Sequence, residues 1–202
     1  MDGRGRRGGG LAVPVSLAVL CALVVGGFAV HFRGYYGASV VMRRQLALHA
    51  VLRPAGLVGL GFGVGAGAMV LWNVAYLMRR WKVGRRVMPG GRRGWMNWHV
   101  FTGLAAAPLA LIHSSFVVRN SVGGHALVVL GVVVISGIAG RVYLARLAGF
   151  AHTGHGGFSS WRLVHRWLAL LLVLLVVIHV GVSLRYGSFD LIQDRAAKGV
   201  RR

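Results

Sequence analysis

Acidic residues and cysteine are scarce in this chain. Of 202 residues only three are acidic, Asp2, Asp190 and Asp194, and none of them lies within an apolar run. The chain therefore lacks the residues for paired-carboxylate hydrolysis, for a carboxylate metal cage or for a carboxylate proton relay. The single cysteine, Cys21, excludes a disulfide framework, a cysteine-rich zinc site and covalent c-type haem attachment, and we interpret it as a small apolar packing residue.

Charged residues of both signs are also few. They make up 13% of the chain, against 56% hydrophobic residues and a mean hydropathy of +0.66. A soluble domain usually has about 25% charged and about 45–50% apolar residues. The apolar residues form runs of about 20, the length that a helix needs to cross a bilayer. This composition excludes a soluble globular enzyme and predicts an all-α integral membrane protein.

Five apolar segments are long enough to be transmembrane helices. Because the connections between them are short, neighbouring helices should be antiparallel and form a single membrane domain over 1–202. We expect a four-helix bundle preceded by an N-terminal helix. Residues 31–53, which mix aromatic, basic and aliphatic side chains, are expected to form a short helix in the membrane interface. The five predicted spans are 11–30, 55–78, 98–118, 125–144 and 164–184.

The first span has an alternative interpretation as a cleaved signal peptide, because Arg4, Arg6 and Arg7 precede it. Its apolar run is longer than the usual ~7–15 residues of a signal peptide, which favours an uncleaved anchor. Cleavage would leave the four-helix bundle and its topology unchanged.

Basic residues predict the orientation and the partners of the chain. With five spans, 14 Lys and Arg residues lie on the side of the N-terminus and 10 on the opposite side. This bias predicts a cytoplasmic N-terminus and an external C-terminus in a bacterial inner membrane. The net charge of +21 could suggest nucleic acid, but arginines beside apolar helices more often contact anionic lipid. We therefore expect membrane lipid, and no nucleic acid, as a partner.

Three glycines in the second span, Gly59, Gly63 and Gly67, recur every four residues on one helix face. Close packing of helices through small residues is the simpler interpretation. Room for a flat cofactor against the backbone is the other, and the two are compatible.

Four histidines form the most informative pattern. His99 and His113 lie in the third span, His165 and His179 in the fifth, and both pairs are 14 residues apart. On a helix this spacing returns the second residue to within roughly 40° of the first, about 21 Å further along. Since the two spans run in the same direction, His99 should lie level with His165 on the inner side, and His113 with His179 on the outer side.

A metal cofactor is the simplest way to satisfy these histidines, because no acidic partner is present in the spans. Two imidazoles per site are too few for zinc without thiolate or carboxylate ligands. Two imidazoles on opposite faces of a porphyrin complete the coordination of its iron. The pattern predicts two b haems with bis-histidine ligation, in which the other ring nitrogen of each histidine donates to a backbone carbonyl or a hydroxyl.

Four segments carry the histidines together with their neighbours: WHVFTG at 98–103, LIHSS at 111–115, VHRW at 164–167 and VIH at 177–179. These segments resemble the haem-bearing helices of di-haem membrane b-type cytochromes, a grouping that includes the cytochrome b and ferric-reductase-like transmembrane families. The resemblance covers about residues 55–185 and implies two stacked b haems that carry electrons across the membrane, with the same four histidines as axial ligands. The stretch 136–143 at the end of the fourth span also looks like a feature of bacterial members.

Two departures from these families affect the expected function. The Pro-Glu-Trp-Tyr motif of the quinol site in respiratory cytochrome b is absent, which argues against a quinol-bifurcating site. No segment like a flavin or nicotinamide domain follows the helices, so another subunit or a separate carrier should exchange electrons with this chain.

Residues near the histidines are secondary candidates. Haem propionates are anionic and favour arginine, although interfacial anchoring is the simpler role. His152 and His155 form a His-x-x-His in a loop, a weaker candidate for a metal, quinone or third cofactor. Four tryptophans near the inner histidines, Trp95, Trp98, Trp161 and Trp167, resemble an aromatic belt. The arginine candidates are Arg92, Arg93, Arg162 and Arg166 for the inner haem, and Arg119 and Arg185 for the outer haem.

These patterns together predict an electron-transfer subunit that connects a quinone pool with a redox partner on the opposite face. One alternative is the membrane haem module of a reductase that is fed by a separate flavoprotein. A haem-free transporter or scaffold is the remaining alternative, although no inverted repeat or midplane helix break is evident.

Overall fold

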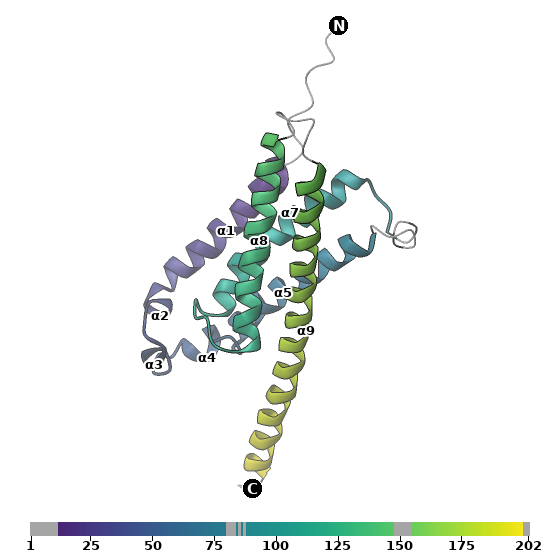
Figure 1. Ribbon diagram of the computed structural model, residues 1–202. Coiled ribbons are helices and arrows are strands. Elements are labelled where there is room, and N and C mark those ends of the chain that lie inside the picture. The colour runs from purple at the N-terminus through teal and green to yellow at the C-terminus, as the bar shows by residue number, and fades with distance from the viewer. Residues whose placement is uncertain (1–11, 80–83, 85, 87, 148–154, 200–202) are drawn as a thin grey trace. The chain divides into compact units, whose positions relative to one another are not determined.

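The part of the chain that the structure describes is mainly helical and contains no strand. The computed structural model describes residues 12–79, 84, 86, 88–147 and 155–199, with side chains to 142 and from 160 to 186. It divides into two compact units, residues 1–118 and 119–202. The helices are α1 (Ala12–His31), α2 (Arg33–Tyr36), α3 (Val40–Arg43), α4 (His49–Leu52), α5 (Leu57–Arg79), α7 (Arg92–His113), α8 (Val122–Leu147) and α9 (His155–Gly199) (Figure 1).

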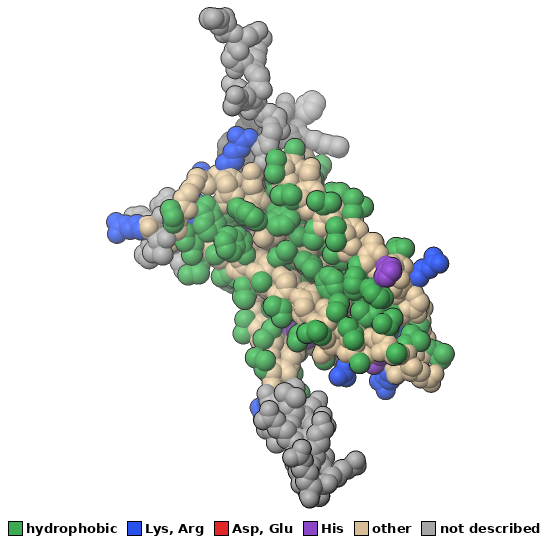
Figure 2. Space-filling view, turned by 180° about the vertical axis from the view of Figure 1, so that it is seen from behind, with side chains coloured by type: hydrophobic (Ala, Val, Ile, Leu, Met, Phe, Trp, Pro, Cys, Tyr) green, Lys and Arg blue, Asp and Glu red, His purple; other side chains and the backbone are tan. Residues whose placement is uncertain are grey.

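Four helical segments are long and apolar enough to cross a membrane: Ala12–His31, His49–Arg79, Val122–Val142 and Ser160–Tyr186. They correspond to the first, second, fourth and fifth predicted spans. Large hydrophobic side chains on them are exposed, for example Leu23, Leu57 and Leu184. Figure 2 shows hydrophobic side chains over most of the face in view, with Lys and Arg at its margins. The chain is thus compatible with a multi-pass membrane protein.

The third predicted span, 98–118, is wrong at both ends. The corresponding helix, α7, begins at Arg92 and ends at His113. Ser115 and Phe116 adopt positive φ angles of 54° and 59°, a backbone conformation that stops an α-helix. Helix α7 has 22 residues and is therefore about 33 Å long. Because it contains polar residues, it is not apolar enough to count among the four candidate membrane spans.

The helices α8 and α9 extend beyond the apolar runs that predicted them, whereas α1 and α5 agree with theirs to within two residues. The fifth span was predicted over 164–184, whereas α9 continues over 45 residues. Hydropathy detects only the apolar part of a helix, since polar and charged residues can continue the same backbone hydrogen bonds on either side. Hydropathy alone therefore does not give the helix ends.

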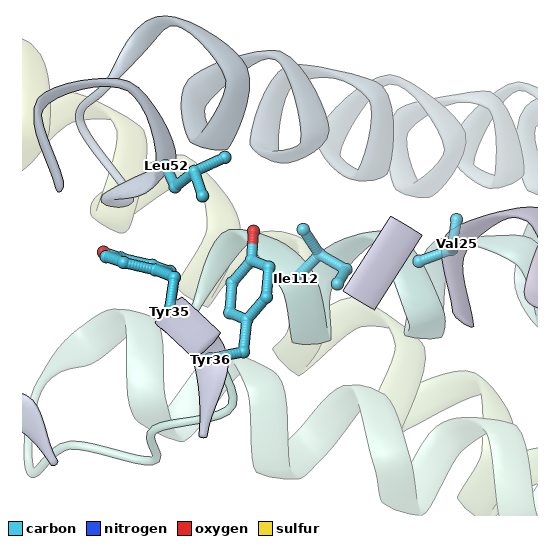
Figure 3. Close-up of a cluster of buried hydrophobic side chains, with 5 residues drawn as sticks. All are labelled: Val25, Tyr35, Tyr36, Leu52 and Ile112. Carbon is cyan, nitrogen blue, oxygen red and sulfur yellow. The ribbon is translucent and has the colours of Figure 1, made fainter. Parts of the chain in front are cut away.

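Residues 31–53 form three short helices, α2, α3 and α4, in place of the single short helix expected. The side chain of Ser39 caps the start of α3 by accepting a hydrogen bond from the backbone nitrogen of Met42. The segment packs into the first unit, whose core cluster contains Val25, Tyr35, Tyr36, Leu52 and Ile112 (Figure 3). This segment is therefore part of the core of the first unit.

Arg43, the last residue of α3, is buried against the C-terminal end of α7. Its guanidinium donates to the backbone oxygens of Ser115 (2.8 Å), Ala38 (2.9 Å) and Tyr36. Ser115 follows His113 by two residues, so Arg43 fastens the short helices to the end of α7 that carries this histidine. Burial and the neighbouring Tyr35 raise the pKa of the Tyr36 phenol, and Arg43 opposes this rise.

Each unit contains an antiparallel helix hairpin. In the first unit α7 packs against α5 and also against α1, and in the second unit α8 packs against α9. In each hairpin the second helix carries two of the four histidines.

Candidate functional site

The spacing prediction is confirmed within each hairpin. His99 and His113 lie on one continuous helix, α7, and His165 and His179 lie on another, α9. All four side chains are half-buried. The two members of each predicted pair belong to different units, so the pairing of His99 with His165 and of His113 with His179 stays a prediction.

His99 is bound by an amide side chain on α5. Its Nδ1 lies 2.7 Å from Oδ1 of Asn73, whose Nδ2 donates to the carbonyl of Met69 at 3.1 Å. Since Nδ2 is used in this way, Oδ1 is the acceptor and Nδ1 of His99 carries the hydrogen. Tyr76 stacks on the imidazole, with 4.6 Å between ring centroids and 21° between planes.

His165 is bound by a hydroxyl on α8. Its Nδ1 lies 2.7 Å from Oγ of Ser136, and the Ser136 hydroxyl donates to the carbonyl of Val133 at 2.9 Å. The serine oxygen therefore accepts from the imidazole, and Nδ1 again carries the hydrogen. Trp161 stacks on His165 at 5.5 Å and 25°, and its indole nitrogen donates to the carbonyl of Ser136 at 3.0 Å.

His113 is bound by the backbone of α5. Its Nδ1 lies 2.9 Å from the carbonyl oxygen of Gly59. A carbonyl only accepts, so Nδ1 carries the hydrogen here too. A Cβ at Gly63 would lie 2.5 Å from the same Nδ1, so only glycine leaves this ring in place. On α9, His179 has a similar neighbour, because a Cβ at Gly123 would lie 2.8 Å from its Cε1.

The four surroundings fall into two kinds. The predicted inner histidines, His99 and His165, each have a side-chain oxygen acceptor and a stacked aromatic ring. The predicted outer histidines, His113 and His179, each lie against a glycine of the preceding helix. The second helix of each hairpin therefore shows the same order along the chain, first a histidine with a side-chain acceptor and a stacked ring, then a histidine against a glycine.

The expected donation to a backbone carbonyl or a hydroxyl is confirmed for two histidines, His113 and His165. His99 also donates from Nδ1, but its acceptor is a side-chain amide oxygen, which was not predicted. With the hydrogen on Nδ1, the ring lone pair is on Nε2, which is the form of neutral imidazole that binds a metal through Nε2.

The glycines of α5 have separate roles. Gly59 lies against the backbone of Arg53 and supplies its carbonyl to His113, while Gly63 makes room for the imidazole. At Gly67 a Cβ would meet nothing within 4 Å. The periodic pattern thus combines backbone packing at one position with space for a histidine at the next.

Asn73 and Ser136 are the functional candidates that sequence reasoning missed. Asn73 is the only Asn, Gln, Ser or Thr residue in the predicted span 55–78, and Ser136 is the only one in the predicted span 125–144. A lone polar side chain in an apolar span is itself a signal of function. The stretch 136–143 also gains a role, because Ser136 and Gly137 lie against His165 and Gly140 lies against Trp161.

The arginine candidates are exposed, and their role toward propionates stays a prediction. Arg92 and Arg93 form the first turn of α7, Arg119 precedes α8, and the rest lie on α9. The guanidinium of Arg166 lies 6.0 Å from the ring of Trp167. The exposed candidates are Arg92, Arg93, Arg119, Arg162, Arg166 and Arg185.

Other predicted features lie partly outside the described residues. His152 and the N-terminal arginines Arg4, Arg6 and Arg7 are outside them, and for His155 only the backbone, at the start of α9, is described. Of the predicted belt, Trp95 stacks on Trp72 at 5.8 Å, and its indole nitrogen donates to the carbonyl of Pro89. The four histidines that were predicted as ligands all lie on α7 and α9. The proposed binding role of the His-x-x-His loop stays a prediction.

Within the described part of the chain, no three His, Cys, Asp or Glu side chains are grouped so as to hold a metal ion. Comparison of the sequence and the structure with family models, curated proteins and solved structures found no match.

Proposed function

We propose that this protein is a di-haem b-type cytochrome that carries electrons across a bacterial inner membrane, between a quinone pool and a redox partner on the opposite face. The supporting observation is the hydrogen bonding of three histidines, His99, His113 and His165. Each donates from Nδ1 to a fixed oxygen acceptor on the preceding helix. Ligation through Nε2 requires the tautomer that these acceptors select.

The residues fit b haem in their donor chemistry. His99 and His165 would hold the inner haem, and His113 and His179 the outer haem. Because Gly63 and Gly123 have no Cβ, they leave space for the imidazoles of His113 and His179. The bound haems supply reversible one-electron chemistry. The chain orients the imidazoles, surrounds them with apolar helices and, in this proposal, binds propionates through arginines near the membrane surfaces.

This proposal includes α7 as the fifth membrane span, because both of its histidines must lie at the levels of those on α9. Its length of about 33 Å is sufficient to cross the hydrocarbon core. Its polar residues then face neighbouring helices, as His99 and Thr102 do where they contact Asn73 on α5. The basic residues support a cytoplasmic N-terminus and an external C-terminus.

The test is a reduced-minus-oxidised visible spectrum of the purified full chain, with haem quantified per chain as the pyridine haemochrome. We expect about two low-spin b haems, reducible by a quinol. One haem per chain would contradict the double site. No haem, in cells with ample haem supply, would overturn the proposal and favour a transporter or scaffold. Reduction by a flavoprotein but not by a quinol would support the reductase-module alternative.

Replacing Gly63 by alanine is expected to weaken the outer haem site. The new Cβ would lie 2.5 Å from Nδ1 of His113, so the ring must move and lose its bond to Gly59. We expect about half of the haem to be lost on purification, because supporting contacts of a ligand change metal affinity by about 10–100-fold. Haem content per chain measures this loss.

Gly67→Ala is the matched control, one helical turn further along α5. A Cβ there meets nothing within 4 Å, so this variant should retain both haems. Equal haem content in the two variants would show that the space at Gly63 is not needed.

A further inference from the structure

The two predicted inner histidines differ from His113 in one respect that mutation can address. His99 and His165 donate to side-chain oxygens, of Asn73 and Ser136, whereas His113 donates to a backbone carbonyl. The inner acceptors can therefore be removed without altering the backbone.

We propose that Asn73 and Ser136 are positioning residues that set the reduction potential of the inner haem separately from that of the outer haem. This inference rests on the proposed function. An acceptor at Nδ1–H increases electron donation from the imidazole to its metal, which stabilises the ferric state and lowers the reduction potential.

Asn73 is held in place by its own hairpin. Its Nδ2 donates to Met69, and the Thr102 hydroxyl lies 3.1 Å from its Oδ1. The same hydroxyl lies 2.8 Å from the carbonyl of Trp98, in the turn that precedes His99. Asn73 therefore couples the orientation of the His99 ring to the backbone of both α5 and α7.

Ser136 is held in the same way in the second hairpin. Its hydroxyl donates to Val133, and its carbonyl accepts from the indole of Trp161, which also stacks on His165. Each inner histidine thus has its acceptor and its stacked ring assembled within one hairpin.

The experiment is a potentiometric titration of the haem-loaded full chain, followed in the α-band of the visible spectrum. In Asn73→Leu and in Ser136→Ala we expect the same one of the two waves to move to higher potential, and the other wave to stay. A tenfold loss of preference for ferric over ferrous haem would correspond to a shift of about 59 mV. The double variant should move that wave further than either single variant.

Two variants serve as controls. Ser136→Thr keeps the hydroxyl and should leave the wave near its original potential. Ser114→Ala removes a serine that also donates to a carbonyl three residues earlier, that of Leu111, and it should move neither wave.

The outcomes separate this inference from the proposed function. Two haems with potentials unchanged in Asn73→Leu and Ser136→Ala would overturn the inference and leave the di-haem assignment intact. A shift of one wave by Asn73→Leu and of the other by Ser136→Ala would overturn the shared inner haem. Absence of haem from the wild-type chain would remove the proposed function itself.

Discussion

Replacing His99 by alanine is expected to remove one of two haems, and replacing His165 should remove the same one. Each haem in this proposal would be held by two imidazoles, so losing either one should empty that site. His113→Ala and His179→Ala should both remove the other haem. The measurement is haem content per chain, with the potential of the remaining haem identifying which one was lost.

The double variants make this prediction specific to the pairing. Because both residues serve one haem, His99→Ala with His165→Ala should retain about one haem per chain, as each single variant does. His99→Ala with His113→Ala should retain none, since these residues serve different haems. His125→Ala is the control, because His125 is exposed on α8 and has no part in either site. Retention of one haem by the His99/His113 double variant would contradict the pairing.

Replacing Arg43 by alanine is expected to destabilise the first unit strongly. The substitution leaves three carbonyl oxygens, of Tyr36, Ala38 and Ser115, without their donor at a buried position. An unsatisfied buried polar group costs about 1–3 kcal/mol, so we expect a loss of about 3 kcal/mol or more in the free energy of unfolding. Denaturation of the micelle-solubilised protein with SDS, followed by tryptophan fluorescence, measures this loss.

Arg44 provides the control for Arg43. It is the next residue along the chain and is exposed, so Arg44→Ala should change the free energy of unfolding by less than about 0.5 kcal/mol. Arg43→Lys should fall between the two, because an ammonium retains the charge but cannot reach three carbonyls with the planar fork of a guanidinium. Equal stability of Arg43→Ala and Arg44→Ala would show that the buried guanidinium does not hold the end of α7.

Arg43 also illustrates what hydropathy and charge rules cannot predict. By sequence it is one of several basic residues between two apolar runs, which favours a solvated or interfacial position. The fold buries it because the short helices bring three backbone carbonyls together around it. No local pattern encodes that arrangement, since Ser115 is 72 residues away in the sequence.

The helices likewise have one property that the sequence predicts, their apolar segments, and one that it does not, their ends. The apolar runs predicted the four described segments that are long and apolar enough to cross a membrane, because this property depends on composition and length. They misplaced the ends of α7, because its polar first turn continues the helix and the left-handed residues at Ser115 and Phe116 stop it after His113. Backbone hydrogen bonding and turn conformation decide helix ends, and neither follows from hydropathy.

The sequence by itself determined the all-helical class, the apolar segments and the four histidines as pairs on single helix faces, because composition and the helical repeat are local properties. Only the tertiary structure decided the surroundings of each imidazole. The oxygen of Asn73 reaches His99 across 26 positions, and that of Ser136 reaches His165 across 29. Antiparallel packing brings these distant residues together, and the resulting hydrogen bonds select the imidazole tautomer that a metal needs.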